Sequence, residues 1–365
     1  MFRRASTRLP GVVRLCFVGP MMGRRAGYLT SQGLLVANWL ARNGEYAVTT
    51  TSAVTNRYLR LLDIVATLIR SRNDVDVQCL EVYGGPSFVV EDLASFIGRA
   101  CGHRVVMVLH GGALPEFIDR HPRWTRRVLN RADALVAPST YLQRAVGRSG
   151  LQARVIPNVL DLEAYPFRPR RHIRPHLFWM RSFHPIWNPE MAVRVLARVK
   201  RRFPEATLTM AGQDKGMLGG VQRLAAERGV LGSVRFPGFL DSEGKRREAA
   251  AADIFLNTNR IDNMPVAVVE ACAMGLPVVS TKVGGISDLL VHGETGLLVL
   301  DDDDEAMADA VIELVGDDAL VERLSAGGRR LAERSDWKAV RPQWDLLIAE
   351  LHSSSPASTA YPQVT

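Results

Sequence analysis

Cysteine is scarce in this chain of 365 residues. The four that occur are dispersed through apolar segments, at Cys16, Cys79, Cys101 and Cys272. No Cys-x-x-Cys pair exists, which argues against a structural zinc site and against a disulfide framework. We therefore expect reduced, buried thiols and a cytoplasmic protein.

Metal-binding patterns are also few. His172 and His176 are four residues apart, but no carboxylate or thiol accompanies them in an arginine-rich stretch. Asp74-Val-Asp76 superficially matches an Asp-x-Asp metal motif, yet its setting is better interpreted as the start of a strand. We therefore expect no bound metal and no cofactor.

No run of apolar residues approaches the ~20 that a membrane span requires. The N-terminal segment superficially resembles a signal peptide, but its apolar part is short and is interrupted by Arg14. It leads directly into a turn at Gly19, so Val12–Val18 is interpreted as a first strand. Any membrane contact is expected to be peripheral, at the inner face.

Positive charge is in excess, with a formal net charge of +8 and a pI near 9.6. Such a balance favours an anionic partner such as a nucleotide, a phospholipid surface or an acidic glycan. The basic residues cluster in Arg123–Arg131 and Arg168–Arg174, which fit a solvated helix face and a linker as well as a lipid-facing patch. Neither cluster interleaves aromatic residues as single-strand binders do, so no nucleic-acid partner is expected.

Strand-like apolar runs alternate with helical patterns along the whole chain, which predicts an α/β fold with parallel sheets. The expected strands are Val12–Val18, Val75–Val82, Arg104–Leu109, Ala134–Ala137, Arg154–Ile156, His176–Met180, Ala206–Met210, Val234–Phe236, Ile254–Asn257 and Pro277–Ser280. The expected helices are Ser31–Asn43, Pro189–Phe203, Met217–Gly229, Val266–Met274, Glu305–Val315, Asp318–Arg334 and Trp337–Leu351.

The length suggests two domains. The proline-rich and basic stretch Tyr165–Arg174 breaks both periodicities and is interpreted as the linker. We expect one Rossmann-like domain over 1–165, a second over 166–335, a helix over 336–352 that crosses back to the first domain, and a disordered tail over 353–365.

Residues 257–290 carry the most informative pattern. A strand ends near Asn257, and after a polar loop a helix begins at Pro265 or Val266. The free first-turn amides and the dipole of such a helix form an anion site suited to phosphate. Glu270 lies one turn further among apolar neighbours, where a lone carboxylate is costly unless it is paired or binds a ligand. A carboxylate so placed can accept two hydrogen bonds from a ribose diol.

The run from Glu270 through Ala-Cys-Ala-Met-Gly-Leu-Pro-Val-Val to Gly284-Gly285 resembles the signature of family 4 glycosyltransferases. That family's pattern is Glu-x7-Glu; here Asp262 stands in the first position. The resemblance covers almost the whole chain. It implies the GT-B fold, in which two Rossmann-like domains with parallel sheets face a central cleft. It also implies metal-independent, retaining transfer of a sugar from a nucleoside diphosphate.

The resemblance also assigns roles to single residues. His110 would lie near the transferred sugar, Arg181 would hold the diphosphate, Asp262 would bind sugar hydroxyls and Glu270 the ribose. Further donor contacts are implied for Gly19, Gly23, Gly212, Asn263, Met264, Pro265, Val266, Gly284 and Gly285.

One departure from the family is the lysine that follows the arginine after five or six residues. Ile186 and Trp187 occupy those positions. Arg260, Lys215 and Lys282 are candidate replacements, and the sequence does not choose among them.

Several functions remain open at this point. A transferase acting on a UDP or GDP sugar, with a glycan, lipid-linked or small-molecule acceptor, is the first choice. A non-catalytic nucleotide-sugar-binding protein and a sugar-nucleotide epimerase of the same fold are alternatives. A dinucleotide oxidoreductase is disfavoured because Gly-x-Gly-x-x-Gly is absent.

Overall fold

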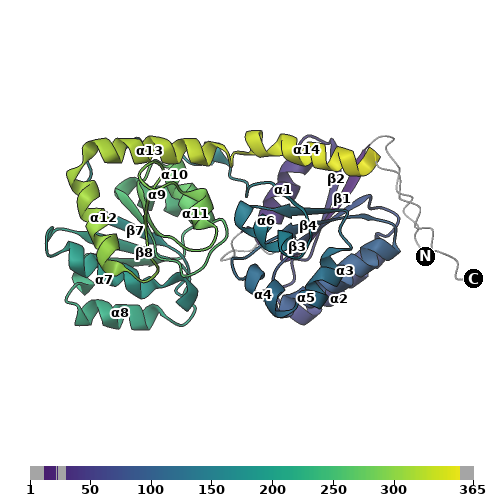
Figure 1. Ribbon diagram of the computed structural model, residues 1–365, viewed down its shortest axis with the longest axis horizontal. Helices are drawn as coiled ribbons and strands as arrows, with labels where there is room; N and C mark the ends of the chain where they lie inside the picture. Colours follow the sequence, from purple (N-terminus) through teal and green to yellow (C-terminus); the bar gives the residue numbers. More distant parts are fainter. Residues whose placement is uncertain (1–11, 22, 24–29, 354–365) are drawn as a thin grey trace, which may run out of the picture.

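Two parallel six-stranded sheets, each covered by helices on both faces, organise the chain (Figure 1). This computed structural model describes residues 12–21, 23 and 30–353. The predicted α/β architecture of two Rossmann-like units is therefore confirmed. We call the parts built around the two sheets the first and the second domain. The expected disordered tail lies outside the described residues except for Ser353, which ends a helix.

The first sheet has the strand order β2-β1-β3-β4-β5-β6. Its strands are β1 Val13–Val18, β2 Tyr46–Thr51, β3 Val77–Val82, β4 Arg104–Leu109, β5 Ala134–Ala137 and β6 Ala153–Val155. Strands β3 and β4 are almost entirely buried, as expected for parallel strands that are covered on both faces. Strand β2 was not among the expected strands, because half of its residues are threonine and only alternate positions are half-buried.

Six helices connect these strands. They are α1 Gln32–Ala41, α2 Arg57–Arg70, α3 Phe88–Ala100, α4 Leu114–Arg120, α5 Pro122–Leu129 and α6 Thr140–Gly147. Serine and asparagine side chains begin three of them: Ser31, Asn56 and Ser139 accept hydrogen bonds from first-turn amides of α1, α2 and α6.

The second sheet has the strand order β12-β11-β10-β7-β8-β9. Its strands are β7 His176–Met180, β8 Thr207–Ala211, β9 Val234–Gly238, β10 Ile254–Asn257, β11 Val278–Thr281 and β12 Leu297–Val299. Its helices are α7 Pro189–Val199, α8 Leu218–Glu227, α9 Ser242–Ala251, α10 Val266–Ala273, α11 Ile286–Leu289, α12 Asp304–Gly316 and α13 Asp318–Glu333. The order places β10 and β7 at the centre, so the loops that follow them sit in the middle of one sheet edge.

The basic stretch Arg168–Arg174 packs on the second domain. The backbone amide of Arg168 donates to the carbonyl of Met274, and Arg170 is buried with its guanidinium on the carbonyls of Ala249 and Ala252. The prolines exclude regular structure here, but these backbone acceptors fix the segment. These arginines therefore hold the linker in place.

The last helix, α14 Trp337–Ser353, returns to the first domain (Figure 1). Its buried face packs with β1 and α1: Trp344 lies 6.3 Å from Phe17 and Trp337 lies 5.7 Å from Trp39, between ring centroids. A backbone bridge between Leu160 and Asp336 joins the two segments that pass between the domains.

Candidate active site

The carboxyl ends of strands from both sheets meet between the domains. His110 follows β4, Ser139 follows β5, Arg181 follows β7 and the loop of residues 258–265 follows β10. In parallel α/β sheets this edge is where ligands bind, because loops there carry side chains that the strands hold rigidly. Six of the predicted site residues are thus brought to one interface: His110, Arg181, Asp262, Asn263, Met264 and Pro265.

Direct contacts join the two domains at this interface. A Cβ atom on Gly112 would lie 2.8 Å from the backbone of Asp262, so only glycine permits this approach. The hydroxyl of Ser139 donates to the side-chain oxygen of Asn263, and the amide side chain of Asn158 donates to the carbonyl of Met264 at 3.3 Å. The loop before α10 therefore touches the first domain directly.

Arg181 and Asp262 form an ion pair within this interface. The Asp262 carboxylate also accepts hydrogen bonds from the Asn259 side chain and from the Asn263 amide, each at 2.7 Å. Both ionic groups are partly buried, so their attraction is less screened than at an exposed surface. The two residues predicted to hold the diphosphate and the sugar hydroxyls therefore contact each other.

Trp187 occupies the place next to Arg181 where the family has a lysine. Its ring lies 4.5 Å from the Arg181 guanidinium carbon, within the range of a cation–π contact. Of the candidate replacements, Arg260 pairs with Asp301 and Asp302 instead. Lys215 and Lys282 are exposed. Trp187 thus orients Arg181 without adding a charge.

The predicted glycines lie against backbone. Gly284 has φ +51°, and a Cβ atom there would lie 2.1 Å from the Asp262 carbonyl oxygen. A Cβ on Gly285 would lie 2.0 Å from the Asn263 carbonyl oxygen, and one on Gly212 would lie 1.8 Å from that of Arg181. These glycines therefore allow the site loops to pack closely. Close packing alone explains why glycine is required at these positions, whether or not the glycines also contact a ligand. Gly19 lies beside Glu81, and Gly23 lies beside Thr30; between these two glycines only Met22 lies outside the described residues.

Helix α10 begins at Val266 with Pro265 as its N-cap, and no side chain caps its first amides. Those amides are left for a ligand or solvent, as the sequence pattern predicts. All later residues of α10 are buried, including Glu270, which is only 4% exposed.

Glu270 has two partners that the sequence did not reveal. The Lys245 ammonium lies 2.8 and 3.1 Å from its two oxygens, and the Tyr165 hydroxyl donates to it at 2.6 Å. Burial and the neighbouring carboxylate raise the pKa of the Tyr165 hydroxyl. These two partners satisfy the buried carboxylate and fix its position within α10.

His110 lies at the first-domain side of the interface, 7% exposed. Its ring stacks on Tyr83 at 5.0 Å, and its Nε2 lies 2.8 Å from the Glu81 carboxylate. Glu91 lies nearby and accepts a hydrogen bond from the Tyr83 amide; burial raises the pKa of Glu91 to about 8. Neither glutamate was singled out by the sequence analysis.

The residues of the two metal-like sequence patterns pair with side chains of the protein. Asp76 binds Arg14, with the closest contact at 2.6 Å, and lies just before β3. His172 pairs with Asp318 on an irregular segment, and His176, the first residue of β7, lies near Asp253 at 3.7 Å. Within the described ranges no three potential metal ligands gather, and no helix there is long and apolar enough to cross a bilayer.

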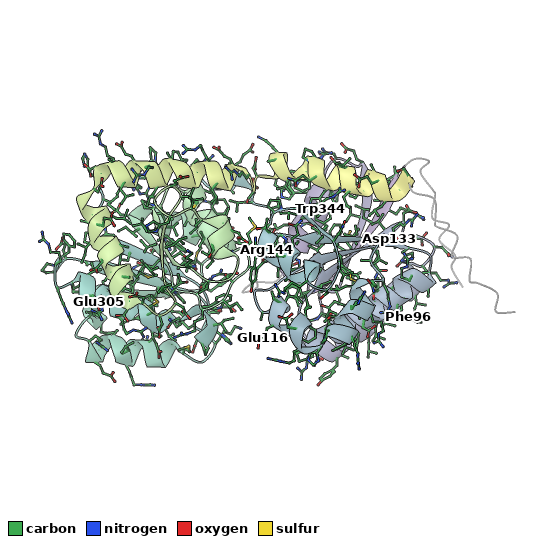
Figure 2. All side chains as sticks on the ribbon, viewed as in Figure 1. Phe96, Glu116, Asp133, Arg144, Glu305 and Trp344 are labelled. Atoms are coloured by element: carbon green, nitrogen blue, oxygen red, sulfur yellow. The ribbon has the colours of Figure 1, made fainter. Side chains whose placement is uncertain are left out.

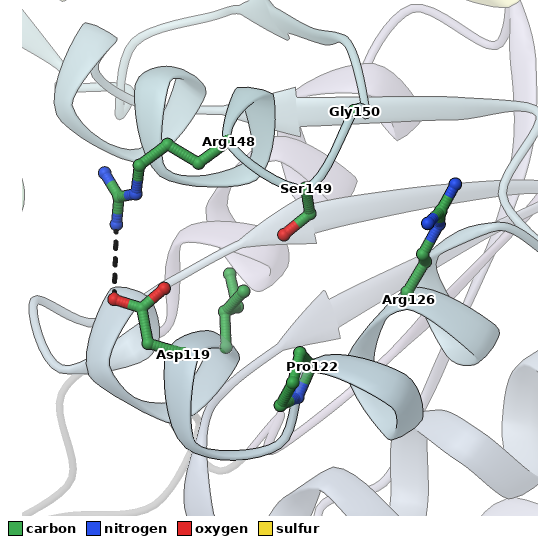
Figure 3. A pocket seen from close by; sticks show the side chains of 7 residues that line it. Asp119, Pro122, Arg126, Arg148, Ser149 and Gly150 are labelled. Carbon is green, nitrogen blue, oxygen red and sulfur yellow. Dashed lines mark hydrogen bonds and ion pairs between the residues drawn. The ribbon is translucent and has the colours of Figure 1, made fainter.

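A surface hollow lies apart from these groups, between α4, α5 and α6 (Figure 3). Its lining includes Asp119, Arg126, Arg148 and Ser149, and Arg148 pairs with Asp119 at 3.5 Å. None of the predicted site residues lines it, so we do not assign it to the reaction.

Comparison with known proteins adds independent information. A family model described as Glycosyl transferases group 1 matches residues 174–317. The chain is 27% identical over 227 residues to a phosphatidyl-myo-inositol mannosyltransferase of Mycobacterium leprae, covering 60% of this chain and 59% of that protein. It is 26% identical over 273 residues to a GDP-mannose-dependent alpha-(1-6)-phosphatidylinositol monomannoside mannosyltransferase of Mycolicibacterium smegmatis, covering 69% and 71%.

Solved structures share the fold. Anabaena HepE in complex with UDP superposes with a TM-score of 0.74 at 17% identity, covering 93% of this chain and all of that one. The match spans less than two thirds of the Mycobacterium leprae relative. Residues 174–317 thus resemble the glycosyltransferase group 1 model, and the chain has the fold of the GT-B glycosyltransferases.

Proposed function

We propose that the chain transfers a sugar from a UDP or GDP sugar to a glycan, lipid-linked or small-molecule acceptor, with retention and without metal. The observation that carries this proposal is the convergence of Arg181, Asp262 and the start of α10 at the sheet edge, opposite His110. A cation, free helix amides and a carboxylate are the groups that a nucleotide sugar requires.

Binding of the donor would replace the ion pair between Arg181 and Asp262 by contacts to the ligand. The diphosphate would pair with Arg181, and the hydroxyls of the sugar would donate hydrogen bonds to Asp262. As the bond from the anomeric carbon to the phosphate oxygen breaks, negative charge grows on the leaving diphosphate. Arg181 and the amides at Val266 would stabilise that charge. Glu270, oriented by Lys245, would hold the ribose.

Two donor classes are suggested by the relatives. One mannosyltransferase relative is described as GDP-mannose-dependent, and HepE was solved with UDP. We therefore rank GDP-mannose and UDP-glucose as the first donors to test.

The decisive experiment measures nucleoside diphosphate release from a panel of UDP and GDP sugars, without metal, beside thermal stabilisation. Release from one donor that falls by roughly tenfold to hundredfold in Glu270→Ala, the loss of a charge-assisted hydrogen bond, would support the transferase. Glu333→Ala is the control, because Glu333 is an exposed glutamate paired only with Arg329. Equal loss in both variants, or no donor recognised by folded protein, would contradict the proposal.

A non-catalytic nucleotide-sugar-binding protein is the second candidate. This candidate is favoured because Trp187 stands beside Arg181 where the family has a lysine. Of the two cations expected to hold the diphosphate, only Arg181 is therefore present. Donor-induced stabilisation without release, across a screen of acceptors, would support it. Conversion of the donor sugar without any acceptor would instead indicate an epimerase.

Peripheral contact with a membrane is proposed for the outer face of the first domain. Helices α2 and α3 pack together and expose seven large apolar side chains. This apolar ridge consists of Tyr58, Leu59, Leu62, Ile69, Val89, Leu93 and Phe96. Figure 2 shows Phe96 on this outer face. Exposed Arg57 and Arg70 flank the ridge, which suits an anionic lipid surface near a lipid-linked acceptor.

Vesicle co-sedimentation tests this contact. We expect binding to vesicles with phosphatidylserine but weak binding to phosphatidylcholine alone, and loss of binding in Leu62→Glu. Leu346→Glu, at an equally exposed leucine on α14, is the matched control. Equal binding of the vesicles by both variants would contradict the proposal that the ridge contacts the membrane.

A further inference from the structure

Glu81 is an acidic residue on a fully buried strand of the first sheet. It lies on β3, between β1 and β4, and its side chain is fully enclosed, with 0% exposure. A carboxylate in such a place is costly unless another group makes use of its charge. In the described part of the chain, no lysine or arginine side chain pairs with Glu81.

The surrounding backbone is shaped to admit this carboxylate. The Gly33 amide donates to Glu81 Oε2 at 3.1 Å. A Cβ atom on Gly33 would lie 2.3 Å from the carboxyl carbon, and one on Gly19 would lie 2.7 Å from the Glu81 side chain. Two glycines, one just after β1 and one in α1, thus leave room for one side chain. The other oxygen, Oε1, is buried without a partner among the described residues.

His110 is the group that faces this carboxylate. Its Nε2 lies 2.8 Å from Glu81 Oε2, a close contact whose angle is not that of a hydrogen bond, while the Tyr83 ring stacks on the imidazole at an interplanar angle of 21°. The ring is therefore fixed both in position and in plane. Within the described ranges, Nδ1 makes no hydrogen bond to another residue and is not among the enclosed polar atoms.

We propose that Glu81 is a positioning residue that keeps the proton of His110 on Nε2 and leaves Nδ1 as an acceptor for a hydroxyl of the substrate. A carboxylate at one ring nitrogen selects the tautomer of the other, which decides whether that nitrogen donates or accepts. His110 precedes Gly111 and Gly112, and Gly112 touches Asp262 across the interface. Nδ1 of His110 therefore lies in a ring two residues before the contact between Gly112 and Asp262, where the domains meet.

The part of this inference that concerns substrate rests on the proposed transferase function, whereas the tautomer does not. Nitrogen NMR of protein with labelled histidine reads the tautomer in the absence of any donor. The His110 signal is assigned by its loss in His110→Asn. We expect the Nε2–H pattern in the wild type and a mixture of tautomers in Glu81→Gln, which removes the charge and keeps the size.

Glu91→Gln is the matched control, because Glu91 is equally buried in the same domain and bonds the Tyr83 amide instead of His110. It should leave the His110 pattern unchanged. In turnover, Glu81→Gln should lower kcat roughly tenfold to hundredfold with little change in donor KM, and Glu81→Asp should restore part of the loss.

A wild-type His110 in the Nδ1–H form, or a pattern that Glu81→Gln does not alter, would overturn the proposal even if that variant loses stability. Normal turnover of Glu81→Gln would overturn its catalytic part. If no donor is turned over by the wild type, the proposed function fails on its own, and the NMR result still decides whether Glu81 sets the tautomer.

Discussion

Among single residues, Glu270 depends most on partners distant in sequence. Lys245 and Tyr165 hold its buried carboxylate. Lys245→Met would leave that charge with the tyrosine alone, so we expect a loss of about 3 kcal/mol in the free energy of unfolding. Adding Glu270→Gln to Lys245→Met should recover at least half of the loss, because the unpaired charge disappears. Denaturant unfolding of the single and double variants measures both.

The control for this cycle is Lys338→Met. Lys338 pairs with Glu163 at 2.7 Å, but both side chains are about three-quarters exposed, and such solvent-screened pairs contribute little to stability. A loss in Lys338→Met as large as that in Lys245→Met would mean that burial does not set the strength of the Glu270 pair.

Glu91 should make stability depend on pH. Burial raises its pKa from 4.5 to about 8, so the folded protein binds a proton that the unfolded chain releases between these values. The stability that this proton contributes is complete below pH 4.5 and is lost as pH rises toward 8. Wild type should therefore lose roughly 3–5 kcal/mol relative to Glu91→Gln over this range. Unfolding at pH 5.5, 7 and 8.5 tests this, and parallel pH profiles would refute it.

The sequence predicted the site residues that lie next to local signals. Arg181 follows a strand, and Glu270 lies within a recognisable run, so the sequence analysis singled out both as candidates. Lys245 is 25 residues from Glu270, and nothing near Lys245 marks it as a partner. Glu81 did carry a signal, a lone acid within the apolar strand Val77–Val82, but its role appears only when β3 and β4 lie side by side.

At the scale of elements, the turn after β11 shapes the site loop. Gly284→Ala would add a side chain 2.1 Å from the Asp262 carbonyl oxygen at a positive φ. We expect a backbone cost of about 1–2 kcal/mol and a further 1–3 kcal/mol from displacing the loop, together with loss of donor-induced stabilisation. Gly293→Ala is the control, since Gly293 has φ +79° but faces open space. Thermal unfolding with and without donor separates strain from loop displacement; equal effects would contradict this account.

Elements were predicted well where their burial makes them apolar. Strands β4, β5, β7 and β10 have the expected bounds. Helix α9 was missed because its sequence, SEGKRREAAA, shows no apolar periodicity and only three of its residues are buried. That helix carries Lys245, so the missing element and the missing site residue have one cause. Its position is set by packing on the sheet, which a local pattern does not encode.

For the whole molecule, the two sheets meet through a small polar contact and are also joined by α14 (Figure 1). Trp337 and Trp344 bury α14 against the first sheet, whereas α13, just before it, packs on α10 of the second domain. The large apolar contacts thus lie along α13 and α14, where the chain passes between the domains. At the candidate active site, the domains are joined by hydrogen bonds between polar groups. Such a division allows the domains to close on a ligand and to reopen.

Asp288 tests this division. It accepts hydrogen bonds across the interface from Thr140 at 2.9 Å and from Arg144 at 2.7 Å. Figure 2 shows Arg144 on the side of the first domain that faces the second. Because Arg144 is largely exposed, Asp288→Ala should change the free energy of unfolding by less than about 1 kcal/mol. The same energy would shift the ratio of closed to open molecules by about fivefold. X-ray scattering should therefore show a larger radius of gyration without donor, and donor should restore compaction at a higher concentration. Asp119→Ala, which breaks the Arg148 pair within the first domain, should change neither property. An unchanged radius of gyration in Asp288→Ala would mean that other contacts hold the domains closed.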